Sequence, residues 1–211
     1  MPSREPSSRW AGVRRHPRLT IAALLLVGAL ALTAVLGGWA RTTPEGVTRA
    51  TPGTEVAATP FRIQLDRAEA TYELAGRPAE PGLAYIVVEG VLTLDSLETV
   101  GSTTLGELLS VDLPKGYDAF GNPSDVAEPG VTVAEDGSML LGIGPGLSYD
   151  VLVTFIVDEA DVPDQLTVTL HEHVRRKSSL DYTLGWHDPA PVARMTFDVA
   201  PLPADRPQEE F

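Results

Sequence analysis

Two histidines flank a glutamate in the segment Leu170-His171-Glu172-His173, at the end of an alternating apolar stretch. Residues two apart on a β-strand lie on the same face, so both imidazoles can approach one metal ion. Imidazole nitrogen is a common zinc ligand, and His187 with Asp188 would complete the ligand set if the fold brought them near. The alternative is a pair of solvated polar residues at a strand end. Zinc binding by His171 and His173 is therefore a hypothesis that depends on the fold.

Four acidic residues, Asp158, Glu159, Asp161 and Asp164, crowd one short segment. Carboxylate oxygens at close range are the ligands that calcium needs. Their spacing does not follow the EF-hand loop, and acidic loops are usually solvated. The segment is thus a calcium-site candidate whose alternative is a charged surface loop.

Arg175, Arg176 and Lys177 form the single basic cluster after residue 41, and Ser178-Ser179 follows them. We expect these residues in a hairpin tip or loop. Such a cluster can contact an acidic protein partner or anionic lipid headgroups. It can also be a soluble turn that protects an edge strand from pairing with other chains.

The sequence contains no G-x-S-x-G elbow, Walker loop or H-E-x-x-H motif. It contains no cysteine, which excludes disulfides, thiolate metal sites and a cysteine nucleophile. The net charge is −13, and a negative field of this size repels nucleic acid. We expect neither an enzyme nor a cofactor, and we expect no nucleic-acid partner.

An uncharged apolar run occupies residues 19–40, which is long enough to cross a bilayer. Five arginines and one glutamate precede it, a charge of +4, so that the remainder carries −17. By the positive-inside rule, residues 1–18 are cytoplasmic and the rest is extracytoplasmic. A cleaved secretory signal or a twin-arginine export signal is the alternative to this single-pass anchor. Ala29, Thr33 and Gly37 share one face of the span and are candidates for close helix packing.

The anchor and its basic end position the remaining segments outside the cell membrane. Residues 41–60 and 201–211 are rich in small residues and proline, which predicts a disordered stalk and a disordered tail. Between them, residues 61–200 carry strand signals, and Asp136-Gly137 marks a hairpin. Predicted strands cover residues 61–66, 84–94, 131–133, 139–141, 149–157, 165–170 and 195–199, with one helical turn at 105–109. An all-β immunoglobulin-like β-sandwich is the expected ectodomain, and a small barrel is the alternative.

The order of three pieces resembles a known family. A strand begins at Tyr85-Ile86-Val87-Val88, a Pro145-Gly146 turn leads into the strand 150–157, and Asp161-Val162-Pro163 precedes the strand 165–170. These pieces resemble an immunoglobulin-like domain of unknown function from secreted and membrane-anchored Gram-positive proteins, actinobacterial ones included. That group is similar to a secreted mycobacterial antigen. The resemblance covers residues 63–170, with 174–200 as an appended hairpin, and it implies a fold but no activity.

The sequence favours a membrane-tethered module that acts by protein–protein contact outside the cell. Its expected partners are the lipid bilayer and an envelope or membrane protein, for example in an envelope or transport complex. The alternative is an ectodomain that binds or senses a divalent ion or a small solute.

Overall fold

The computed structural model describes residues 46–206, apart from residues 114 and 181. In this part of the chain, nine strands form one hydrogen-bonded sheet. Seven of them follow the order β11-β13-β6-β3-β15-β14-β8, while β2 pairs with β3 and β1 pairs with β15 off this path. Their bounds are β1 Thr48–Arg49, β2 Glu55–Ala58, β3 Phe61–Thr71, β6 Leu83–Leu94, β8 Leu109–Val111, β11 Gly130–Val133, β13 Ser148–Asp158, β14 Gln165–Lys177 and β15 Leu184–Ala200.

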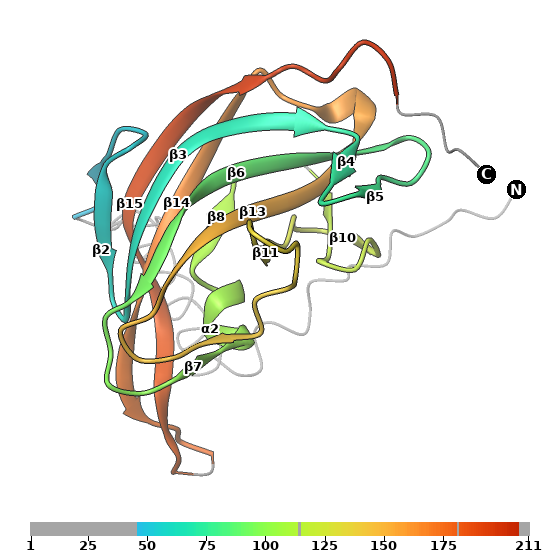
Figure 1. The fold of residues 1–211 in the computed structure, drawn as a ribbon. Coiled ribbons are helices and arrows are strands. Elements are labelled where there is room, and N and C mark those ends of the chain that lie inside the picture. The colour runs from blue at the N-terminus through green and yellow to red at the C-terminus, as the bar shows by residue number, and fades with distance from the viewer. Residues whose placement is uncertain (1–45, 114, 181, 207–211) are drawn as a thin grey trace, which may run out of the picture. The chain divides into compact units, whose positions relative to one another are not determined.

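The sheet curls into two layers because two strands, β2 and β15, pair with the same edge of β3 (Figure 1). Strand β2 pairs antiparallel with residues 61–64, and β15 pairs in parallel with Ala68 and Glu69 further along the same edge. One layer therefore contains β2, β3, β6, β13 and β11, and the other contains β1, β15, β14 and β8. The described part of the chain is a β-sandwich, which confirms the predicted all-β sandwich class.

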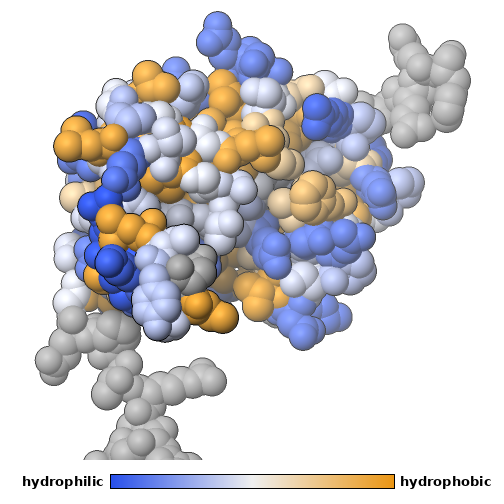
Figure 2. Space-filling view, turned by 90° about the horizontal axis from the view of Figure 1, so that it is seen from below, coloured by the Kyte–Doolittle hydropathy of each residue, from blue (hydrophilic) through white to orange (hydrophobic). Residues whose placement is uncertain are grey.

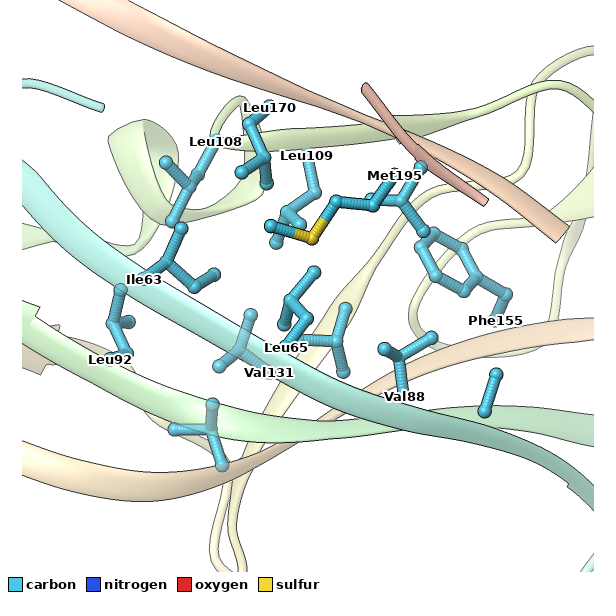
Figure 3. Close-up of a cluster of buried hydrophobic side chains, with 14 of the residues drawn as sticks. Ile63, Leu65, Val88, Leu92, Leu108, Leu109, Val131, Phe155, Leu170 and Met195 are labelled. Atoms are coloured by element: carbon cyan, nitrogen blue, oxygen red, sulfur yellow. The ribbon is translucent and has the colours of Figure 1, made fainter. Parts of the chain in front are cut away.

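The core lies between the layers because the long strands alternate. Val151, Val153, Phe155 and Val157 of β13 are buried, while the residues between them face outward. Figure 3 shows Leu65, Val88 and Phe155 from one layer opposite Leu109, Leu170 and Met195 from the other. Burying these side chains is the main favourable term for a fold of this kind.

Gly90 shows how closely β3 and β6 approach each other. A bulge in β3 between Leu65 and Arg67 lies opposite Gly90. A Cβ atom at Gly90 would lie 2.1 Å from the carbonyl oxygen of Gln64. Only glycine fits at this point of the sheet.

The strongest predicted strands are confirmed, and several bounds differ. The expected helical turn at 105–109 is replaced by α2, Ser102–Gly106, and Leu109 begins β8. In the Asp136-Gly137 hairpin, the second strand contributes one bridge, between Thr132 and Met139. The remaining short elements are β4 Glu73–Leu74, β5 Arg77–Pro78, β7 Val100–Gly101, β9 Gly116–Tyr117, β10 Pro123–Ser124, β12 Gly142–Ile143 and a 3₁₀ turn at Glu159–Asp161.

The predicted stalk at 41–60 is wrong over its described residues. Strands β1 and β2 extend the two layers, and Ala58 is fully buried. Backbone pairing with a preformed sheet edge stabilises such a segment without a large apolar cluster of its own. Residues 41–45 lie outside the described part.

The predicted disordered tail at 201–211 is also wrong where it is described. Arg206 donates hydrogen bonds to the carbonyl oxygens of Ala79 (2.8 Å) and Leu83 (3.2 Å). Its guanidinium lies 4.9 Å from the centre of the Tyr72 ring. These contacts hold residues 201–206 against the sandwich, and residues 207–211 lie outside the described part.

Over the described residues, no helix has the length and apolar character needed to cross a bilayer. The predicted span at 19–40, its candidate packing residues Ala29, Thr33 and Gly37, and the basic segment 1–18 lie outside those residues.

Candidate functional site

Strands β14 and β15 continue past the sandwich body as a two-stranded projection, which we call the arm (residues 174–187; Figure 1). Register pairs run from Val174 with His187 to Lys177 with Leu184. The Ser178 amide donates to the carbonyl oxygen of Thr183 (2.7 Å) and closes the tip. The expected hairpin at 174–200 is present but is not appended, because β14 begins at Gln165 in the sandwich body and β15 is central to its layer.

The two candidate zinc ligands lie at the base of the arm. The His173 side chain is fully buried, and its Nε2 atom is 3.4 Å from Oε2 of Glu107. His171 is half-buried, and its Nδ1 atom, like both ring nitrogens of His173, has no hydrogen-bond partner among the described residues. The expected strand end with solvated histidines is therefore not observed, because β14 continues and the neighbouring segments cover the imidazoles.

Burial determines the protonation of both imidazoles. Desolvation lowers the pKa of His171, and the neighbouring His173 lowers that pKa further. Desolvation also lowers the pKa of His173, against the opposing effect of the Glu107 carboxylate. Both side chains are consequently neutral at pH 7.

No described group of three or more His, Asp or Glu side chains is arranged to hold a metal ion. Asp188, the expected additional ligand, pairs with Arg176 (Oδ1 to Nη2, 2.7 Å). The described residues therefore bring His171 and His173 together without completing a zinc site.

A groove of about 440 Å³ lies between residues 99–107 and the arm. Trp186, Glu107 and the Arg176–Asp188 pair line it, together with three threonines (Thr99, Thr103 and Thr104) and His187. The buried Nε2 atom of His187 has no partner among the described residues. This mixture of an aromatic face with donors and acceptors can bind a small polar solute.

The acidic segment is tied to separate tyrosines. The Tyr117 hydroxyl donates to Asp158 (2.7 Å), and the Tyr72 hydroxyl donates to Glu159 (2.7 Å). These hydrogen bonds raise the pKa of both tyrosines. Asp161 and Asp164 do not join them in a described cation cluster. Asp158 and Glu159 thus hold the segments that carry Tyr117 and Tyr72 against the end of β13. Calcium binding by the acidic segment stays a prediction.

The basic cluster is not a loop, which corrects the expectation. Arg175, Arg176 and Lys177 lie in β14, where they pair with Trp186, Gly185 and Leu184. Arg175 forms an ion pair with Glu98, and Arg176 forms one with Asp188. The turn begins after them, at Ser178.

A small pocket on the outer face of the β6–β13–β11 layer escaped sequence reasoning. Its volume is about 170 Å³. Tyr85, Thr154 and Ile156 belong to its floor, while Phe120 and Met139 lie at its rim. Phe120 is 80% exposed and Met139 is 44% exposed, whereas the Thr154 hydroxyl is buried without a hydrogen-bond partner among the described residues.

The tertiary structure assembles this pocket from distant segments. Gly137, with a φ of +69°, brings the 134–138 loop against Ala75, where an added Cβ would lie 2.5 Å from the Ala75 Cβ. The sequence carries no diagnostic signal for it, because single apolar residues such as Phe120 and Met139 are common on protein surfaces.

No family model and no curated protein matches the chain. Among solved structures, an uncharacterised β-sandwich protein from Clostridium difficile is 12% identical over 75% of this chain and 99% of its own, with a TM-score of 0.44. A candidate lipoprotein from Staphylococcus aureus is 9% identical, covering 74% of this chain and 97% of its own (TM-score 0.41). One from Bacillus subtilis is 13% identical, covering 70% and 38% (TM-score 0.37).

At these identities and scores the likenesses carry no argument about function. By its structure, the described part of the chain belongs to the class of β-sandwich proteins, and it carries a projecting two-stranded arm. No finding links the chain to the actinobacterial or mycobacterial sandwiches of the predicted resemblance.

Proposed function

We propose that this protein is a membrane-tethered module on the outer side of the cell membrane that works by protein–protein contact, for example as an accessory subunit of an envelope or transport complex. The immunoglobulin-like form of the sandwich and the anchor at residues 19–40 belong to this proposal. The observation that carries it is the rimmed pocket formed by Tyr85, Phe120, Met139 and Thr154.

The size of the pocket favours a protein partner. Pockets for small molecules usually enclose about 300–1,000 Å³, whereas this one has about 170 Å³. It therefore fits one large side chain of a partner. The exposed side chains of Phe120 and Met139 supply apolar contact area around the pocket. In protein interfaces, much of the binding energy typically comes from one partner side chain that fills a pocket of this kind.

The unpartnered hydroxyl of Thr154 adds a chemical preference. A buried hydroxyl without a hydrogen bond is costly, and a partner group that supplies one removes that cost. An aromatic anchor with a polar end, such as tyrosine, satisfies both the apolar walls and this hydroxyl.

In-cell photo-crosslinking from position 120 of the full chain tests the proposal. We expect one discrete crosslinked protein in the parent chain and its loss in Met139→Asp. Leu147→Asp is the matched control, because Leu147 is 47% exposed against 44% for Met139 and lies outside the pocket. Crosslinks that persist in Met139→Asp, or that disappear equally in Leu147→Asp, would contradict the pocket as the contact.

The groove beside the arm favours a second candidate function, the binding of a small solute. Its volume of about 440 Å³ falls within the usual range for ligand sites. Neutral sugars and divalent ions are suitable probes for a thermal melt of residues 46–206, because a bound ligand raises the melting temperature. We expect any shift to be lost in Glu107→Gln, and a melt that no probe shifts would remove this candidate.

A further inference from the structure

The direction of β1 shows where the chain enters the sandwich. Thr48 and Arg49 pair in parallel with Ala193 and Arg194 of β15. Strand β15 begins at the tip of the arm and ends at Ala200. The chain that leads into Thr48 therefore approaches from the end of the molecule that carries the arm.

The spacer between the predicted anchor and β1 is short, because the structure replaces most of the expected stalk with strands. Seven residues separate Ala40 from Thr48, and the eight steps between them at 3.3–3.6 Å span about 26–29 Å at most. Along β15, the nine steps from Ala193 back to Leu184 extend at most about 30 Å toward the tip, and less where Asp188 (φ +56°) and the bulged pairing interrupt the strand. The arm and the fully extended tether are thus of similar length, so the tip can reach the surface to which the tether leads.

The tip of the arm is apolar and open to solvent. Leu180 is 93% exposed, Tyr182 is 77% exposed, and Leu184 and Val174 are also exposed. Figure 2 views the molecule from the side on which the arm projects, and hydrophobic surface lies there directly beside hydrophilic surface. Leu97 is exposed on the loop whose Glu98 pairs with Arg175 of the arm.

The charges of the arm nearly cancel. Arg175 and Arg176 are paired with Glu98 and Asp188. Lys177 carries the positive charge that remains on the described residues of the arm. Attraction to anionic lipid is consequently weak, and apolar contact is the main force available to the tip. Tyrosine is a side chain that favours the membrane–water interface, since its ring is apolar and its hydroxyl is polar.

We propose, on the basis of the tether in the proposed function, that the arm tip docks into the interface of the same bilayer that holds the anchor, through Leu180, Tyr182 and Leu184. A tether this short keeps the tip at an effective concentration on the order of millimolar at the surface, so weak apolar contact suffices. The consequence is a fixed orientation, in which the arm faces the membrane and the opposite end of the sandwich faces outward.

A cysteine-free chain makes the test direct, because a single introduced cysteine is labelled uniquely. The full chain is reconstituted in vesicles with an environment-sensitive fluorophore on Leu180→Cys. The control is Ala160→Cys, an exposed site in the 3₁₀ turn that follows β13, at the end of the sandwich remote from the arm. Fluorescence quenching by a quencher attached to lipid tails is then compared between the two sites.

We expect quenching several-fold stronger at position 180 than at position 160, with little dependence on the anionic lipid content. Equal, weak quenching at both sites in vesicles that retain the chain would overturn the docking proposal. Quenching at position 180 that requires anionic lipid would overturn apolar docking as its cause. Shielding of position 180 from water-soluble quencher only in native membranes would overturn it in favour of a protein contact.

Co-flotation of the chain with the vesicles is measured in the same samples. Because the contact of the tip is too weak to retain the chain without the tether, co-flotation reports on the anchor, and failure of the tether is distinguished from failure of the docking. In a retained chain, Leu180→Asp combined with Leu184→Asp should reduce quenching of a label at position 182 to the level of position 160. Unchanged quenching in that variant would also contradict the proposal.

Discussion

At the scale of single residues, the buried histidines and one glycine are the most constrained positions. His173 is buried with both ring nitrogens unpartnered in the described structure, at 3.4 Å from a carboxylate that is itself half exposed. Gly90 lies where β3 and β6 approach too closely for a side chain. Each position leads to a measurable prediction about stability.

We predict that residues 46–206 lose stability as the pH falls below about 6.5, the ordinary pKa of histidine. Burial lowers the pKa of His171 and His173 in the folded state, so between that lowered value and 6.5 the unfolded chain binds more protons. The contribution is complete above about pH 7 and is lost on acidification. Urea unfolding at pH 7.5, 6.5 and 5.5 measures it.

The variant His173→Leu keeps an apolar side chain in the same space and should flatten this pH dependence. Glu107→Gln removes the carboxylate that supports the protonated imidazole, so we expect a steeper dependence. Parent and His173→Leu profiles of equal slope would show that this histidine is not the responsible group.

We predict that Gly90→Ala destabilises the sandwich by about 1–3 kcal/mol, the usual cost of forcing an extra group into a packed site. The added Cβ would lie 2.1 Å from the Gln64 carbonyl oxygen. Gly101→Ala is the control, because a Cβ there meets no atom within 4 Å. Similar unfolding free energies for the two variants would refute the close approach.

At the scale of elements, the structure differs most from the sequence-based prediction at β1, β2 and the arm. The segment that composition assigns to a stalk instead extends both layers, and the segment expected as a turn instead forms a strand of the arm. Both differences have the same origin, because backbone pairing with distant strands stabilises segments that lack strong local signals.

We predict that a chain shortened to begin at residue 61 melts several degrees below one that begins at residue 46. Loss of β1 and β2 leaves the edge of β3 unpaired between Phe61 and Gln64 and uncovers the core at Phe61. For a domain of this size, each 1 kcal/mol corresponds to roughly 2–4 °C. Calorimetry on both chains makes the comparison, and equal melting temperatures would restore a stalk-like role for residues 46–60.

At the scale of the whole molecule, two surfaces point in different directions. The rimmed pocket lies on the outer face of the β6–β13–β11 layer, whereas the apolar tip lies at the end of the arm. A module that docks on lipid at one end and presents a side-chain pocket elsewhere holds its protein contact in a defined orientation. In this arrangement, the proposed tether and arm would fix the direction in which the pocket faces its proposed protein partner.

We predict that protease added to intact cells cleaves this protein outside the membrane, as the proposed orientation of the arginine-rich end and the apolar span implies. Val126 and Phe120 lie in exposed loops and are suitable early cleavage regions. A fragment that carries residues 1–18 should stay with the membrane. Protection of the sandwich in intact cells with cleavage after lysis would reverse the orientation.

The sequence by itself determined the sandwich class and the long inner strands, because alternation such as that of Val151, Val153 and Phe155 is a local property with a period of two. It also identified the residues of possible chemistry, His171, His173 and the acidic segment. Local spacing showed neither the burial of His173 nor the Asp158–Tyr117 hydrogen bond. Only the tertiary structure decided these, because contacts between residues far apart in the chain depend on how the layers pair and curl. The arm, the placement of β1 and β2 in the two layers and the rimmed pocket follow from the same non-local pairing.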